Sequence, residues 1–189
     1  MNAHLQTLVW SGKTMTSAEC CTLMQIDDGF QFTGSVVLSD ADVPARIMYM
    51  LHCDAAWRSE SVVIGAWIGA SEHRLTLRRD DHGRWRQDHV LLEGYDGALD
   101  LDLGFSPATN TLAIRRLCLP IGGSAEIAPV WVDFPSLKVM PLPQRYTRLS
   151  ESTYRFESLT SDFTAMLTVD SFGMVRDYEG LWESRAHMP

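Results

Sequence analysis

The chain has 189 residues, of which 46% are hydrophobic, and a formal net charge of −8. This length suits one domain with a core large enough to need neither disulfides nor a structural metal, so we predict a single domain over residues 1–189. The negative charge disfavours nucleic acid as a partner, because binding a phosphate backbone requires a basic surface. It disfavours anionic membrane surfaces for the same reason.

The sequence shows no segment typical of export or membrane crossing. Residues Met1–Gln6 do not combine a basic segment with an apolar run and a small-residue cleavage site. No stretch approaches the ~20 apolar residues that cross a bilayer as a helix. Free thiols are expected, because the spacing of the cysteines suits neither a metal site nor a disulfide framework. We therefore expect a cytoplasmic protein that does not span a membrane.

Short alternating runs bounded by Asp, Gly and Pro dominate the chain, which predicts a mainly antiparallel β fold with little helix. Three turns begin with Asp and close with Gly, at residues 27–29, 80–83 and 170–173. So many strands require a large curved or closed sheet, and the periodicity fits an open roll and a closed barrel equally well. The expected strands are Cys20–Ile26, Phe30–Leu38, Ala45–His52, Ser61–Ile68, His73–Arg79, Trp85–Leu91, Leu99–Leu103, Leu112–Leu119, Ile127–Phe134, Leu137–Met140, Tyr154–Ser158, Phe163–Asp170 and Met174–Arg176.

Two acidic residues alternate with leucines in the expected strand Leu99–Leu103. The alternation places Asp100 and Asp102 on one face of the strand and the leucines on the other. The two carboxylates would lie roughly 6–7 Å apart, near the separation of the paired carboxylates of glycosidases. Two acids on one strand are also typical of a solvated face or of partners for arginine. The pattern therefore fits a catalytic pair and a structural or ligand-binding role.

Arg115 and Arg116 lie within the expected strand Leu112–Leu119, where neighbouring side chains point to opposite faces. One guanidinium group would then face the apolar side, unless a β-bulge shifts the alternation. A guanidinium group in that position requires a carboxylate or an anionic ligand. We predict that one of the two arginines pairs with Asp100 or Asp102 or meets the polar head of a ligand. The alternative is an internal salt bridge that stabilises the roll.

The segment Ser106–Thr111 is expected to be a polar turn between two strands. Thr109 and Asn110 offer hydroxyl and amide groups that suit the hydroxyls of a sugar, and equally suit hydrogen bonds that cap the turn. Aromatic side chains with a polar edge suit a sugar face or an acyl chain, with core packing as the alternative. Those singled out are Trp57, Tyr146 and Trp182.

Motifs of well-known chemistry are missing from the sequence. There is no HExxH or Cys/His cluster for zinc, no GxSxG elbow for a hydrolase and no Gly-rich phosphate loop. We therefore expect neither a metal nor a cofactor, and the missing catalytic motifs favour a binding role over an enzyme.

Two regions resemble the bacterial family named Putative glycolipid-binding, formerly a domain of unknown function. The first is Leu99–Leu117, and the second, Arg145–Trp182, carries its matches at Arg145-Tyr146, Tyr154–Glu157 and Tyr178–Trp182. The resemblance implies a spiral β-roll or curved half-barrel, related in shape to lipoprotein-carrier folds. It also implies a glycolipid or another amphiphile as the ligand.

From the residues and the resemblance together, we expect a non-catalytic protein that binds a glycolipid or lipid-like amphiphile. One alternative is an enzyme that acts on a glycoconjugate, with Asp100 and Asp102 as acid and base. Another is an interaction module whose sheet edges recruit a partner strand. The candidate ligand-binding residues are Asp100, Asp102, Thr109, Asn110, Arg115, Arg116, Trp57, Tyr146 and Trp182.

Overall fold

The computed structural model describes residues 2–189, which form seventeen strands and one helix. In chain order the elements are β1 (Ala3–Gly12), β2 (Ser17–Ile26), β3 (Gly29–Asp40), β4 (Val43–Asp54), β5 (Ser59–Ile68), β6 (Ser71–Arg79), β7 (Trp85–Gln87), β8 (Val90–Leu91), β9 (Leu101–Leu103), α1 (Asn110–Leu117), β10 (Ser124–Ile127), β11 (Val130–Val132), β12 (Val139–Pro141), β13 (Gln144–Arg148), β14 (Thr153–Ser158), β15 (Thr164–Val169), β16 (Val175–Tyr178) and β17 (Trp182–Met188).

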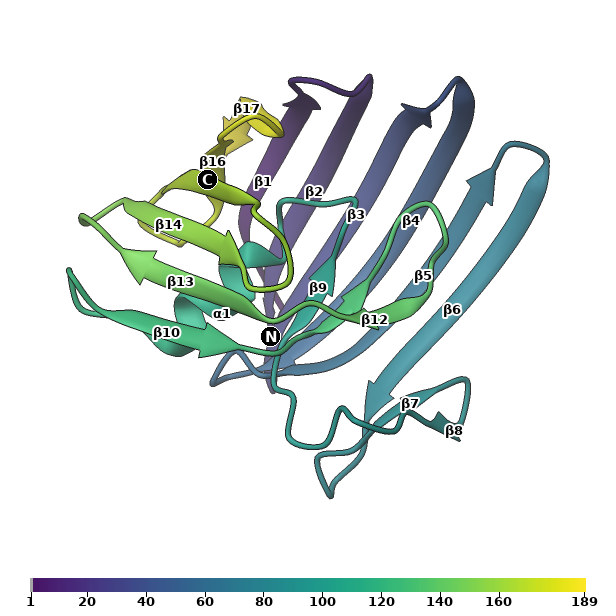
Figure 1. Ribbon diagram of the computed structural model, residues 1–189, viewed down its shortest axis with the longest axis horizontal. Coiled ribbons are helices and arrows are strands. Elements are labelled where there is room, and N and C mark those ends of the chain that lie inside the picture. The colour runs from purple at the N-terminus through teal and green to yellow at the C-terminus, as the bar shows by residue number, and fades with distance from the viewer. Residues whose placement is uncertain (1) are drawn as a thin grey trace.

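Fourteen strands form one curved sheet, in the order β10-β13-β14-β15-β16-β17-β1-β2-β3-β4-β5-β6-β7-β8. This sheet stays open, with β10 at one edge and β8 at the other (Figure 1). A second sheet has the order β12-β11-β9, and its β9–β11 pair is parallel. The expected all-β fold with a large curved sheet and little helix is confirmed, and its open form is a roll rather than a closed barrel.

The helix and the small sheet lie inside the curve of the large sheet. The long strands β1–β6 form its broad part, and the C-terminal strands curve back across the inner face, with α1 and β9 between the two parts (Figure 1). Leu103 on β9 and Leu112 on α1 are accordingly buried. Within residues 2–189, no helix combines the length and the apolar character needed to cross a membrane. The segment from β9 to α1 therefore occupies the interior of the roll.

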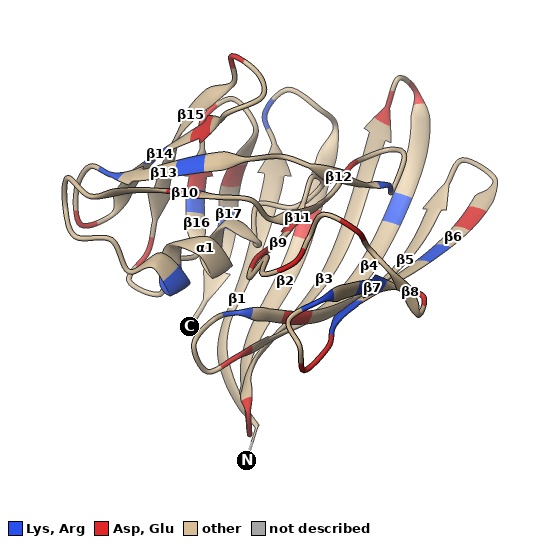
Figure 2. Cartoon of the chain, turned by 60° about the horizontal axis from the view of Figure 1, so that its bottom comes forward, with Lys and Arg blue, Asp and Glu red and all other residues tan. Residues whose placement is uncertain are grey.

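Alternation along the long strands separates a buried inner face from an exposed outer face. On β4, for example, Ile47 and Leu51 are buried, whereas the intervening Met48 is exposed. Charged residues occupy turns and also positions within strands such as β13 (Figure 2). Among residues 2–189, the fully buried charged residues are Glu19 and Asp100. Both acids face the interior, where a charge requires compensation.

The three Asp-initiated turns are confirmed. Asp80 and Asp170 each accept two backbone N–H groups of their own turn on Oδ1. Gly83 and Gly173 then close these turns with φ of +77° and +85°. The turn at residues 27–29 joins β2 to β3. Local side-chain chemistry thus fixes these hairpins, as the sequence indicates.

The expected strand Leu112–Leu119 is wrong, because Asn110–Leu117 forms the helix α1. Residues 110–114 are all buried, so their side chains do not form the single apolar stripe that identifies an amphipathic helix. The helix ends at Cys118, which adopts the left-handed conformation with φ +44°. The two arginines near its end therefore do not point to opposite faces of a sheet, and residues 109–111 do not form an exposed turn.

Candidate functional site

The two carboxylates at β9 line two different cavities. Asp100 and Arg116 line a cavity of about 280 Å³, here called the ion-pair cavity. Asp102, Asn110 and Trp182 line another of about 250 Å³, here called the aromatic cavity. Asp100, just before β9, and Asp102, within it, therefore have separate surroundings.

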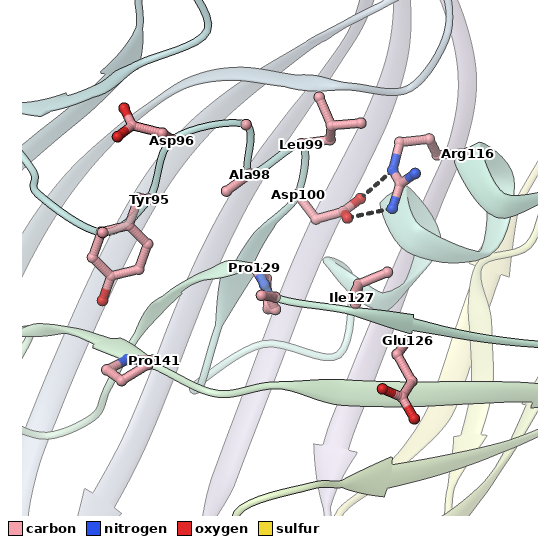
Figure 3. Close-up of a pocket in the computed structure, with 13 residues that line it drawn as sticks. Tyr95, Asp96, Ala98, Leu99, Asp100, Arg116, Glu126, Ile127, Pro129 and Pro141 are labelled. Atoms are coloured by element: carbon pink, nitrogen blue, oxygen red, sulfur yellow. Dashed lines mark hydrogen bonds and ion pairs between the residues drawn. The ribbon is translucent and has the colours of Figure 1, made fainter.

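In the ion-pair cavity, the guanidinium group of Arg116 donates a hydrogen bond to each side-chain oxygen of Asp100 (Figure 3). Nε of Arg116 donates to Oδ1 at 2.8 Å, and Nη2 donates to Oδ2 at 2.6 Å. The side chains are 5% exposed for Asp100 and 17% exposed for Arg116. The structure confirms that one arginine of the pair bonds to one of these acids. The contact is a bidentate ion pair between the end of α1 and the residue that precedes β9.

In the aromatic cavity, Asp102 has neutral partners. Its Oδ1 accepts a hydrogen bond from Thr109 Oγ1 at 3.0 Å, and its Oδ2 accepts one from Gln144 Nε2 at 2.5 Å. Burial raises the pKa of Asp102, the bonds from Gln144 and Thr109 lower it, and the charge of Asp100 raises it further, for a net increase. Neutral donors thus hold this carboxyl without cancelling its charge.

Asn110, the first residue of α1, is held at both ends of its amide. Its Oδ1 accepts a hydrogen bond from the Tyr146 hydroxyl at 2.8 Å, and its Nδ2 donates to the Pro107 carbonyl at 3.1 Å. The polar segment that the sequence indicates is therefore buried, and its groups bond to protein atoms beside the cavity. The candidates that the structure brings together here are Asp102, Thr109, Asn110, Tyr146 and Trp182.

Aromatic side chains form much of the wall of the aromatic cavity. Phe156, Phe163 and Tyr178 contact one another with ring centroids 6.0–6.3 Å apart. Trp131 on β11 and Trp182 on β17 complete the aromatic part. The other lining residues contribute aliphatic groups, serine hydroxyls and the polar groups of Asp102 and Asn110, with no Lys or Arg among them. They are Asp102, Leu103, Gly104, Ser106, Asn110, Leu142, Ser158, Ser161 and Leu181.

Three hydrogen-bond donors at this wall have no acceptor within residues 2–189. Elsewhere in the protein, the buried Trp10 and Trp85 each donate the indole N–H to a backbone carbonyl. The indole N–H groups of Trp131 and Trp182 and the hydroxyl of Tyr178 make no such bond, although all three residues line the cavity. Trp182 and Tyr178 are only 9% and 7% exposed. None of these three donor atoms is among the buried side-chain atoms without a partner, so each is accessible to solvent, and an acceptor atom of a ligand can bond to it in place of water.

A further carboxyl, that of the buried Glu19 on β2, lies behind the cavity wall. Ser106, which lines the cavity, donates to Glu19 Oε1 at 2.8 Å, and the Tyr49 hydroxyl donates to the same oxygen at 2.5 Å. Oε2 has no partner among the described residues. Burial raises the pKa of Glu19 to about 7, although the bonds from Tyr49 and Ser106 act to lower it. This carboxyl therefore changes its charge near neutral pH.

Gly34 allows Tyr49 to reach Glu19. Gly34 on β3 is paired with Tyr49 on β4 and Cys21 on β2, so the tyrosine ring crosses β3 at the glycine. A Cβ atom at Gly34 would lie 2.1 Å from Cε1 of Tyr49. A glycine inside a strand is a sequence signal for such a close approach. That signal indicates a crossing at this position, although it does not identify Glu19.

Arg115 and Trp57 lie outside both cavities. The guanidinium carbon of Arg115 is 5.0 Å from the ring centroid of Trp57, and Trp57 stacks on Phe30 with centroids 4.0 Å apart. This is a cation–π contact between the exposed end of α1 and the turn before β5. Among residues 2–189, no group of three or more His, Cys, Asp or Glu side chains is placed to hold a metal ion.

The fold and the cavity together define an open antiparallel β-roll with a small aromatic chamber beside its internal helix. Residues 7–184 match the family described as Putative glycolipid-binding, and the chain belongs to this family. The structure is similar to the crystal structure of a DUF1089 family protein from Pseudomonas aeruginosa, with a TM-score of 0.79 and 37% sequence identity over 88% of this chain and 91% of that chain. Comparison with curated proteins gave no match. The family expected from the sequence is confirmed.

Proposed function

We propose that the chain is a single domain that binds a glycolipid or a similar amphiphile, with the aromatic cavity as its ligand site. The description of the family supports this class of ligand. The observation that carries the proposal is the wall with three unpaired donors on Trp131, Tyr178 and Trp182. Such a wall offers flat apolar surface together with hydrogen-bond donors, and amphiphilic ligands require both.

The polar groups of the cavity are fixed before a ligand enters. Gln144 and Thr109 hold the carboxyl of Asp102, and Tyr146 holds the amide of Asn110. Groups held in this way lose little conformational freedom on binding, which favours affinity. Asp102 and Asn110 therefore act as ligand contacts in this proposal, while Thr109, Gln144 and Tyr146 position them.

The ion-pair cavity has a structural role in this proposal. The guanidinium group of Arg116 and both oxygens of Asp100 are already engaged with each other. Using either group for a ligand would break a largely buried ion pair, which is costly. Their contact holds α1 against the segment that leads into β9, and the position of Asn110 depends on α1.

The test is native mass spectrometry of the protein purified gently from its own host, followed by organic extraction and lipid analysis. We expect a stoichiometric amphiphile on the protein. Ser161→Trp, at an exposed lining position, should fill the mouth of the cavity and abolish this association. Ser171→Trp places the same side chain in an exposed turn away from the cavity and should retain the ligand.

A ligand-free mass would not yet contradict the proposal, because a weakly held ligand is lost during purification. The second measurement is therefore a titration with chemically diverse amphiphiles, followed by tryptophan fluorescence and melting temperature. The proposal is abandoned if the purified protein is ligand-free and neither signal responds to any of these amphiphiles.

A further inference from the structure

We propose that the aromatic cavity takes the head group of the amphiphile, that this group is an uncharged ring rich in oxygen, as in a neutral sugar, and that anionic head groups are excluded. This inference rests on the proposed function and specifies which part of the ligand enters the cavity. It follows from the unpaired donors, the size of the cavity and the absence of lining cations.

The unpaired donors favour an oxygen-bearing group over an acyl chain. A hydrocarbon in the cavity would leave the N–H groups of Trp131 and Trp182 and the hydroxyl of Tyr178 without water or an acceptor. Each buried and unsatisfied donor costs about 1–3 kcal/mol. Burial and the charge of Asp102 raise the pKa of Tyr178, so its hydroxyl stays protonated and remains a donor. Ring and hydroxyl oxygens of a sugar would satisfy these donors.

The size of the cavity also favours a compact group. Its volume of about 250 Å³ corresponds to roughly eight water molecules at ~30 Å³ each. This space suits one sugar ring with its bound hydroxyls and is short for a long acyl chain. The aromatic walls offer flat apolar faces for the C–H face of such a ring. Asp102 offers carboxylate oxygens as acceptors for the hydroxyl hydrogens.

The charges at the cavity disfavour an anion. No Lys or Arg is among its lining residues, whereas Asp102 lines it and Glu19 lies behind Ser106. A sulfate, phosphate or carboxylate in this space would lose its hydration and face a carboxylate in surroundings of low polarity. Arg116, which lines the ion-pair cavity, is already bonded to Asp100. An uncharged ligand avoids this cost.

The test compares three probes that share one eight-carbon tail and differ in the head group. They are octyl β-D-glucoside, octyl sulfate and octylammonium, each titrated below its micelle concentration by calorimetry and tryptophan fluorescence. We expect the glucoside to bind at least about tenfold more tightly than either charged probe, a difference of about 1.4 kcal/mol. Methyl β-D-glucoside, which has no tail, should compete with octyl β-D-glucoside.

Two variants connect the selectivity to the cavity. Tyr178→Phe removes one donor and should weaken glucoside binding about fivefold to tenfold, the effect of one hydrogen bond, with little change for octyl sulfate. Asp102→Asn removes the charge and should tighten octyl sulfate binding. The matched control is Tyr154→Phe, because Tyr154 is also buried but contacts Arg148 outside the cavity. It should leave both affinities unchanged.

The outcomes separate the two proposals. If octyl sulfate or octylammonium binds as tightly as the glucoside and Ser161→Trp blocks this binding, the cavity is a ligand site but the inference of a neutral head group is wrong. If Tyr178→Phe leaves the glucoside affinity unchanged, the cavity does not bind the sugar. If none of the three probes binds, the inference of a neutral head group is wrong, whereas the proposed function is still decided by the native mass and the wider titration.

Discussion

Asp100 and Asp102 stand two positions apart in the sequence, yet the two cavities they line differ in how the carboxylate is compensated. Both side-chain oxygens of Asp100 accept hydrogen bonds from one guanidinium group, so the charge of the carboxylate is balanced within the pair. Asp102 meets an amide and a hydroxyl, and its cavity contains further donors without partners. A completed ion pair stabilises a structure, whereas an incompletely satisfied polar wall has capacity left for a ligand. This difference can be tested with substitutions that alter the polar groups of one cavity and leave the other cavity unchanged.

The largest expected effect comes from breaking the ion pair. Arg116→Met leaves Asp100 charged and buried without a partner, and we expect the free energy of unfolding to fall by about 3 kcal/mol. Urea unfolding at pH 7 measures the loss. Arg115→Met, on the exposed neighbour in α1, should cost less than about 1 kcal/mol, because it removes a cation–π contact with Trp57.

Adding Asp100→Asn to Arg116→Met should restore part of the stability, because the unpaired charge is then gone. If Arg116→Met is as mild as Arg115→Met, the ion pair does not hold the interior together, and the contrast between the two cavities is lost.

The next effect concerns Glu19, which, like Asp102, has neutral partners. Its pKa rises from an ordinary value of 4.5 to about 7 in the folded protein. Between these values the folded protein binds more protons than the unfolded chain, so stability falls as the pH rises through this range. Glu19→Gln removes the ionisation and keeps an acceptor for Tyr49 and Ser106. At pH 8 it should raise the free energy of unfolding by up to about 3 kcal/mol.

At pH 4 the wild-type carboxyl is protonated, and the stabilities of wild type and Glu19→Gln should agree. Urea unfolding at pH 4, 6 and 8 gives the comparison. Parallel pH profiles for the two proteins would show that Glu19 is not the group that titrates near neutral pH.

A smaller decrease in the free energy of unfolding is expected from Gly34→Ala. The added Cβ would overlap the ring of Tyr49, which must move away from Glu19, and we expect a cost of about 1–3 kcal/mol. Gly65→Ala is the matched control on the outer face, since its Cβ would meet nothing closer than Trp67 at 4.0 Å. The control should be neutral or slightly stabilising. Equal stabilities of the two variants in urea would contradict the described crossing of Tyr49 over β3.

The smallest effect on stability is expected in the aromatic cavity itself. A Cβ at Gly104 would lie 3.0 Å from Nε1 of Trp131 and 3.1 Å from the backbone oxygen of Val132, so Gly104→Ala shifts this indole and its strand by a few tenths of an ångström. We expect a change in unfolding free energy below about 1 kcal/mol, because the indole N–H has no protein acceptor to lose. The tryptophan emission and the affinity for octyl β-D-glucoside should change. Unaltered values of both would show that Trp131 does not contribute to binding.

The sequence predicts much of the large sheet, because its signals are local. Regular alternation identifies strands such as Phe30–Leu38, and the Asp and Gly residues of the turns identify their hairpins. β1 escaped prediction because polarity and burial disagree along it: Gln6 is buried on the inner face, whereas the apolar Val9 lies on the other face. β17 escaped because most of its residues are exposed and few are apolar. A polar residue on the inner face, apolar residues on the outer face and general exposure hide the hydropathy alternation on which such predictions depend.

The candidate site was predictable in part. The polar run that contains Asp102, Thr109 and Asn110 was visible, and the structure groups these residues. The pairing of Arg116 with Asp100 was also expected, although it comes from a buried helix rather than a strand. Gln144 and Glu19 carried no local signal, because their roles depend on strands distant in the sequence. Contacts between such strands are set by the tertiary fold.

The pairing of β1 with β17 has a consequence for the order in which the large sheet assembles. β1 pairs with β2 on one side and with β17 on the other, with Thr7 opposite Met188. The strands β1–β6 can assemble as successive hairpins, but the free edge of β1 stays open until β17 pairs with it. During that interval the inner face that buries Leu8 and Trp10 is incompletely covered. An open strand edge beside an incompletely covered apolar face favours aggregation, so the docking of β17 on β1 is a protective step in folding.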